Sequence, residues 1–232
     1  MIGTEFWASL LQIVAIDILL GGDNAVVIAL ACRDLPEIQK KRAMLWGVAG
    51  AVGVRLVLMF FALALLRVPY LKMAAALFLF WIGVNLLGGE ASEGGSAQGK
   101  ESLFSAIRTI IVADAVMSLD NIVGVAGAAK DDMMLVALGI SISVPIILWG
   151  SRFVLTLMDR FPVLISAGAG LIGWISGSML VSDAAYEKWV RAEMNYLFWA
   201  SPLFLALATI ALGKWRASMR KVESRDLGNE YE

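Results

Sequence analysis

Four aspartates and two asparagines lie inside long apolar segments of the chain, where charged and amide side chains are rare. They occur in two stretches that align without gaps, AIDILLGGDNAVVIALACRD at 15–34 and VADAVMSLDNIVGVAGAAKD at 112–131. The matched polar residues are Asp17 with Asp114, Asp23 with Asp120, and Asn24 with Asn121. Chance is a poor explanation for two acids and an amide in register, so we interpret the stretches as copies of one element.

A carboxylate in the middle of a membrane span costs about 2.5–3.5 kcal/mol on insertion scales, so these acids need positive partners. Arg55 is the only basic residue deep in a predicted span, and it serves either as a charge-compensating residue or as a gate. One arginine leaves an acidic excess, which bound cations or protons would neutralise. If metal entry displaces protons from the carboxylates, metal transport is coupled to proton movement, which we treat as a hypothesis.

The chemistry of these side chains favours a hard divalent cation. Carboxylate and amide oxygens suit Mg²⁺, Ca²⁺ or Mn²⁺, whereas zinc and copper sites usually draw on His and Cys. The chain has no histidine and a single cysteine, Cys32. Asn85, alone in its span, is as consistent with a helix–helix hydrogen bond as with a ligand.

The composition predicts that membrane helices position these residues. The chain of 232 residues is 59% hydrophobic and 17% charged, with a mean hydropathy of +0.78. A spanning helix needs about 20 mostly apolar residues. Seven such stretches occur, at 6–31, 43–66, 72–88, 103–129, 133–156, 162–181 and 194–213.

Asp17 and Asp23 would not share a face of a straight helix, because residues six apart lie about 120° apart around its axis. A break between them would let both point inward. Gly21 and Gly22 favour such a break in the first copy, and Ser118 is a weaker candidate in the second.

Three spans separate the two copies, and an odd number reverses direction, so the halves should be inverted repeats. Transporters built this way bind substrate near the midplane between the repeats. The predicted fold class is therefore an all-α polytopic membrane protein with seven transmembrane helices, two inverted three-helix repeats and one C-terminal helix. The predicted parts are a first repeat at 1–88, a flexible cytoplasmic linker at 89–102, a second repeat at 103–181, a seventh transmembrane helix at 182–213 and a cytoplasmic tail at 214–232.

Basic residues predict the orientation, because cytoplasmic loops carry more Lys and Arg. With seven spans, 13 of these residues fall on one side and 5 on the other. We expect a multi-pass protein of the cell inner membrane, with its N-terminus outside and its C-terminus in the cytoplasm.

At GGDNAVVIA and DAVMSLDNIVGVAG the chain resembles the TerC family, whose paired DN signatures these segments match. The resemblance covers nearly the whole chain, and the family is similar to the LysE superfamily of exporters. It implies a transporter that exports a divalent metal cation, with Mn²⁺ as the expected substrate. It also implies that the metal site is formed by Asp17, Asp23, Asn24, Asp114, Asp120 and Asn121.

Several alternatives stay open. One alternative is a transporter of another cation, either Ca²⁺ or an amine or amino acid, although segments 15–34 and 112–131 contain no aromatic residue to hold an ammonium group. A second alternative is a membrane-protein assembly factor. An intramembrane aspartyl protease is disfavoured because Leu20-Gly21-Gly22-Asp23 lacks the first glycine of GxGD, so we expect no enzyme. The expected partners are the metal ion and the lipid bilayer, with no other cofactor and no nucleic acid; a homo-oligomer is left open.

Overall fold

The computed structural model describes residues 4–61, 65, 68–89, 100–129 and 133–229, and within these ranges all regular structure is helical. Among the described residues, six helices are long and apolar enough to cross a membrane, and α1 makes a seventh when its two bent halves count as one span. The chain is thus a polytopic all-α membrane protein, as the sequence predicts. The helices are α1 (Thr4–Cys32), α2 (Glu37–Phe60), α4 (Leu71–Gly88), α5 (Lys100–Ala129), α6 (Met133–Arg160), α7 (Val163–Val181), α8 (Glu187–Glu193) and α9 (Leu197–Asn229).

Four helix boundaries differ from the predicted ones. Helix α2 starts at Glu37 rather than at 43, since the polar residues after Pro36 already form its first turns. It ends at Phe60 rather than at 66. The segment before the last span, predicted as part of it from 182, instead forms a turn and the short helix α8. Helix α9 continues as far as Asn229, so most residues of the predicted cytoplasmic tail are helical. Most of the predicted linker, residues 90–99, lies outside the described ranges.

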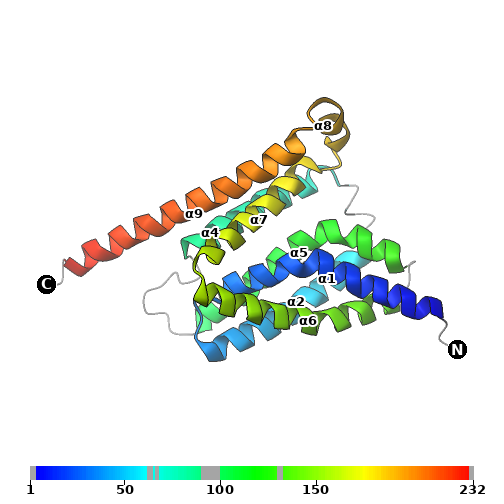
Figure 1. Cartoon of the computed structure of the whole chain (residues 1–232), viewed down its shortest axis with the longest axis horizontal. Helices are drawn as coiled ribbons and strands as arrows, with labels where there is room; N and C mark the ends of the chain where they lie inside the picture. The colour runs from blue at the N-terminus through cyan, green and yellow to red at the C-terminus, as the bar shows by residue number, and fades with distance from the viewer. Residues whose placement is uncertain (1–3, 62–64, 66–67, 90–99, 130–132, 230–232) are drawn as a thin grey trace.

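The long helices form two groups (Figure 1). Helices α1, α2, α5 and α6 make a four-helix bundle, and α4, α7 and α9 pack mainly on one another. We call the boundary between these groups the seam. It is crossed chiefly where α7 meets α1 and where α4 meets α5.

The pairing inside the bundle is reciprocal. Helix α1 packs most extensively on α6, and α2 packs most extensively on α5. If α1–α2–α4 and α5–α6–α7 are related units, the first helix of each unit packs on the second helix of the other unit. This exchange accords with the predicted inverted repeats, whose boundaries stay a prediction.

Glycines let α7 and α9 approach closely. A Cβ atom on Gly173 would lie 2.4 Å from Thr209 Oγ1, and one on Gly177 would lie 2.4 Å from Pro202 Cα. Small residues of this kind allow membrane helices to pack backbone against backbone. The α7–α9 contact therefore leaves no room for side chains at these two positions.

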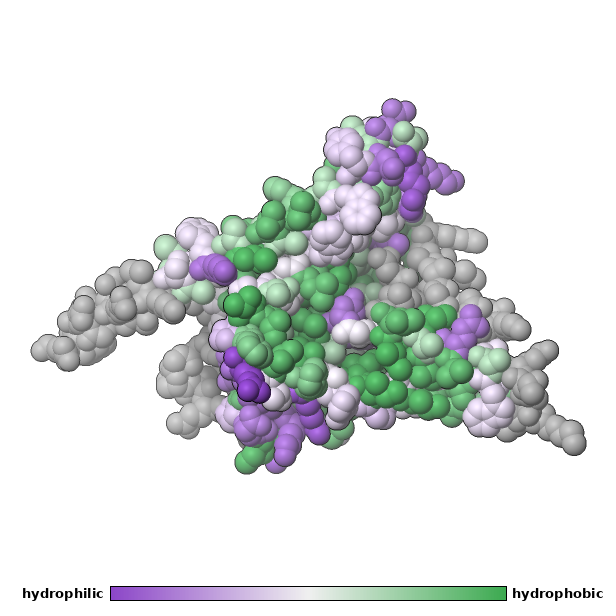
Figure 2. All heavy atoms as spheres, in the orientation of Figure 1, coloured by the Kyte–Doolittle hydropathy of each residue, from purple (hydrophilic) through white to green (hydrophobic). Residues whose placement is uncertain are grey.

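The surface agrees with a membrane setting. Figure 2 shows apolar residues across the middle of the molecule, with hydrophilic residues gathered at the lower left and around α8 at the upper right. Large apolar side chains such as Trp149, Phe153 and Phe204 are exposed on the helices. An apolar band between two polar ends is the surface that a bilayer would cover.

Outside the spans, one buried carboxylate joins two connections. Asp183, in the turn after α7, accepts backbone N–H groups from Tyr70 at 2.9 Å and Met73 at 3.2 Å at the start of α4. It also accepts the N–H of Ala185 at 2.9 Å. A carboxylate that accepts the unpaired N–H groups of a helix start acts as its cap. Asp183 therefore caps α4 from a different part of the chain.

Candidate cation site

Helix α1 bends by 45° between its segments Phe6–Leu19 and Gly21–Cys32. The bend lies next to the predicted break at Gly21 and Gly22, but the helix continues through it. Helix α5 likewise runs without interruption past Ser118, so the break suggested there is not formed. The bend in α1 separates the turn that carries Asp17 from the turn that carries Asn24.

Asp17 and Asp114, the first matched pair, converge on Arg55 of α2. Arg55 Nη1 lies 2.5 Å from Asp17 Oδ1, and Arg55 Nη2 lies 2.7 Å from Asp114 Oδ1. The three side chains are 5% exposed for Arg55, 2% for Asp17 and 12% for Asp114. The structure therefore places Arg55 in the cluster as the residue that compensates both acids.

Serine hydroxyls complete this network. Arg55 Nε–H donates to Ser118 Oγ at 2.9 Å, and Ser118 donates to Asp114 Oδ2 at 3.3 Å. Ser143 of α6 donates to Asp17 Oδ2. All four helices of the bundle thus contribute to the network. Sequence reasoning missed Ser143 and treated Ser118 only as a helix break, and their one signal is a hydroxyl inside an apolar span.

Asn24 approaches the cluster from the second half of α1. Its Nδ2 donates to Asp114 Oδ1 at 2.7 Å, which fixes the amide orientation, because the reverse would set oxygen against carboxylate. Its Oδ1 is then buried and has no hydrogen-bond partner among the described residues. A buried acceptor of this kind costs about 1–3 kcal/mol unless a donor or a cation reaches it.

A small cavity lies beside this amide. Its volume is about 20 Å³, and its polar lining consists of Asn24, Arg55 and Asp114, surrounded by apolar side chains such as Val48 and Ile147. That volume holds one water molecule or one unhydrated ion. The cavity therefore offers room for a single water molecule or cation beside Asn24 and Asp114.

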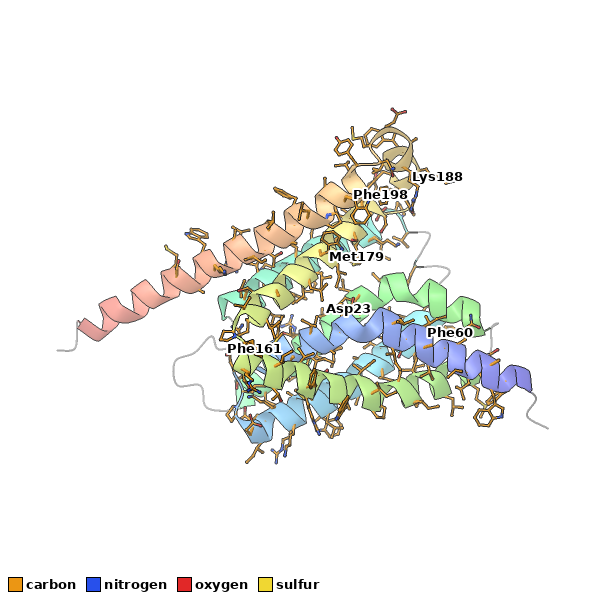
Figure 3. All side chains as sticks on the ribbon, viewed as in Figure 1. Asp23, Phe60, Phe161, Met179, Lys188 and Phe198 are labelled. Atoms are coloured by element: carbon orange, nitrogen blue, oxygen red, sulfur yellow. The ribbon has the colours of Figure 1, made fainter. Side chains whose placement is uncertain are left out.

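Asp23 lies on a different face of α1 from Asn24. Val26 and Leu30, three and seven residues after Asp23, are the closest side chains of α1 to the Gly168 position of α7, so Asp23 shares the face that meets α7. Figure 3 labels Asp23 on α1, at mid-length of the molecule. Its carboxylate is half-buried and accepts the backbone N–H of Asn24 at 2.9 Å. Asp23 therefore points to the seam, and Asn24 points into the bundle.

The predicted ligands thus fall into three sets. Asp17, Asn24 and Asp114 meet in the bundle, and Asp23 lies at the adjacent seam. The side chains of Asp120 and Asn121 lie outside the described part of the structure. Within that part, no group of three or more His, Cys, Asp or Glu side chains is placed to hold a metal ion. The full six-residue ligand set therefore stays a prediction.

Asn85 is not part of this cluster. Its Oδ1 accepts a hydrogen bond from Arg216 Nη1 of α9. Both residues belong to the group of α4, α7 and α9, which the seam separates from the cluster. This contact joins α4 to α9, so the helix–helix interpretation of Asn85 fits the structure.

Comparisons with known proteins agree on one family. The sequence model of the integral membrane protein TerC family matches residues 2–221. The chain is 44% identical to the membrane protein YjbE of Bacillus subtilis over 179 residues, which cover 77% of the chain and 82% of YjbE. It is 26% identical to YceF of the same organism over 190 residues, 78% of the chain and 74% of YceF. It is 24% identical to the inner membrane protein YgdQ of Escherichia coli K12 over 173 residues, 67% of the chain and 73% of YgdQ. No solved structure matches the chain.

Proposed function

Because the chain belongs to the TerC family of integral membrane proteins, we propose that it is a transporter that exports a divalent metal cation, with Mn²⁺ as the preferred substrate. The observation that carries this proposal is the convergence of Asp17 and Asp114 on the single guanidinium of Arg55. With all three groups ionised, the buried cluster keeps one unit of negative charge. In hydrocarbon that charge calls for a further cation or a proton.

The unpaired amide oxygen of Asn24 supports a metal ion rather than a proton alone. Asn24 and Asp114, which both carry hard oxygen ligands, line the cavity of about 20 Å³. Mn²⁺, Ca²⁺ and Mg²⁺ all take such ligands. The preference for Mn²⁺ rests on the family resemblance.

In this proposal, Arg55 is an internal substitute for the transported ion. It holds Asp114 when the site is empty, and it stays on Asp17 when a metal takes Asp114. The half-buried carboxylate of Asp23 at the seam receives the ion before it reaches Asn24. The matched residues Asp120 and Asn121 would serve the second half of the path in the same way.

Exchange for protons is the proposed energy source. A carboxylate that loses its metal inside the bundle is left with uncompensated charge, and a proton removes that charge at little steric cost. Alternating occupation by metal and proton would then drive export against a gradient.

We also propose the orientation that basic residues predict, with the C-terminus in the cytoplasm and the protein in the inner membrane. The relative YgdQ is named as an inner membrane protein, which supports this location. Export would then carry the ion from the end where α9 finishes to the end where α1 begins (Figure 1).

A metal panel in inverted vesicles tests the proposal. Cytoplasm-facing sites are then outside, so export appears as accumulation of Mn²⁺, Ca²⁺ or Mg²⁺ in the lumen. We expect saturable Mn²⁺ accumulation that an imposed proton gradient accelerates and that amines do not inhibit. Inhibition by an amine would favour an amine carrier. Absence of accumulation for every divalent cation would contradict the proposal and favour an assembly role.

A further inference from the structure

A second polar cavity lies away from the Arg55 cluster, at the end of the molecule where α4 finishes. Its volume is about 440 Å³, within the range of ligand-binding pockets. Its polar lining comes from three helices: Asn85 of α4, Ser105, Arg108 and Thr109 of α5, and Arg216 of α9. No acidic residue of the described ranges lines it.

The two arginines give this cavity a positive charge. Arg108 is exposed and forms no ion pair with any Asp or Glu of the described residues, so none of these acids compensates its charge. Arg216 is oriented by its hydrogen bond to Asn85. Guanidinium groups match the geometry of phosphate oxygens, and the hydroxyls of Ser105 and Thr109 add neutral donors.

The position of the cavity matches a lipid headgroup. Trp81, which also lines it, is 51% exposed, as expected for a tryptophan at the membrane interface. The cavity lies at the end that carries most of the basic residues. Basic pockets between membrane helices on the cytoplasmic side are suited to anionic headgroups.

We propose that this cavity binds a phosphate group, supplied by the headgroup of an anionic phospholipid. Bound there, the headgroup contacts α5 of the four-helix bundle and α4 and α9 of the other group, and so bridges the seam. Arg108 lies six residues before Asp114 on the same helix, so lipid binding holds the helix that carries one acid of the cation site. The binding itself is independent of the proposed transport.

Lipid binding to the purified, delipidated full chain tests this proposal. Native mass spectrometry compares retention of phosphatidylglycerol with that of phosphatidylcholine, in the wild type and in Arg108→Gln and Arg216→Gln. Arg160→Gln is the matched control, since Arg160 is exposed at the end of α6 and does not line the cavity. Arg108 makes no hydrogen bond or ion pair with another described residue, so Arg108→Gln reports on binding even if Arg216→Gln folds poorly.

We expect preferential retention of phosphatidylglycerol, weakened about tenfold or more by each cavity substitution and unchanged by the control. A second arm adds inorganic phosphate to lipid-free protein and measures the thermal unfolding midpoint. Stabilisation by phosphate that the cavity variants lose, without lipid preference, would keep the phosphate site and assign it to a soluble compound. Equal retention of both lipids without any phosphate effect, or an equal loss in Arg160→Gln, would overturn the proposal.

Discussion

Arg55 of α2 and Asp114 of α5 form an ion pair, with 2.7 Å between Nη2 and Oδ1, inside a bundle of apolar helices. The same guanidinium also holds Asp17 of α1. The pairing of one cation with two acids explains how both carboxylates are kept in the protein interior. It also leaves the charge that a transported ion would neutralise.

The first prediction concerns Arg55 itself. Arg55→Gln leaves Asp17 and Asp114 buried without a cation, and removing one partner of a buried pair typically costs about 3–5 kcal/mol. We expect a clearly lower thermal unfolding midpoint in detergent. Adding Asp17→Asn to this variant should recover part of the loss. A single variant as stable as the wild type would contradict the observed ion pairs.

The second prediction concerns the unpaired amide oxygen. Asn24→Ala removes both the donor to Asp114 and the Oδ1 that faces no partner. We expect the apparent KM for Mn²⁺ uptake to rise about tenfold, a typical effect of losing a group that supports a metal site. Asn85→Ala is the matched control, because Asn85 bonds Arg216 outside the cluster. Equal effects of the two substitutions would remove Asn24 from the site.

How far the sequence predicts this structure depends on the kind of contact. Apolar length predicts the spans, and the register of two DN segments predicts that Asp17 and Asp114 are related. The convergence of both acids on Arg55 depends on how α2 lies against α1 and α5, which no local pattern specifies. The divergence of Asp23 and Asn24 follows from their adjacent positions on a helix, where neighbours point about 100° apart.

Other structural features have sequence patterns that are too common to predict them. The hydroxyls of Ser118 and Ser143 resemble those of serines that bond their own helix, such as Ser151 with Ile147 O. Asp183 lies in a polar connection, where a solvated carboxylate is the ordinary expectation. Its role as a cap for α4 requires two segments more than 100 residues apart in the chain to meet.

The third prediction uses Asp183, which lies outside the spans. Burial raises its pKa, but the N–H groups of Ala185, Tyr70 and Met73 outweigh this and hold its pKa below the ordinary value of 3.8. Because the folded-state pKa is lower than the ordinary value, the ionised carboxylate stabilises the folded state above about pH 3.8. This stabilisation is lost as the pH falls through the folded-state pKa. We expect Asp183→Asn to unfold at a lower temperature than the wild type at pH 7. The difference should shrink below about pH 3.8; a difference that grows on acidification would contradict this.

The fourth prediction tests the α7–α9 contact. A Cβ on Gly177 would lie 2.4–2.6 Å from backbone atoms of Ser201 and Pro202, which cannot move aside as a side chain would. Gly177→Ala should therefore destabilise the protein by about 1–3 kcal/mol. Gly53→Ala is the control, because its Cβ would meet nothing within 4 Å, and it should be neutral or stabilising. Thermal unfolding in detergent measures both, and similar midpoints would contradict the close contact.

The central claim is that the buried acids bind the transported cation, and Asp114 tests it most directly. Initial Mn²⁺ uptake is measured in inverted vesicles with equal amounts of wild type, Asp114→Asn and the exposed control Asp159→Asn. We predict that Asp114→Asn loses at least about tenfold in uptake, because its carboxylate is both ligand and partner of Arg55, while Asp159→Asn transports normally. Wild-type rates in Asp114→Asn, with the protein folded and inserted, would contradict the account.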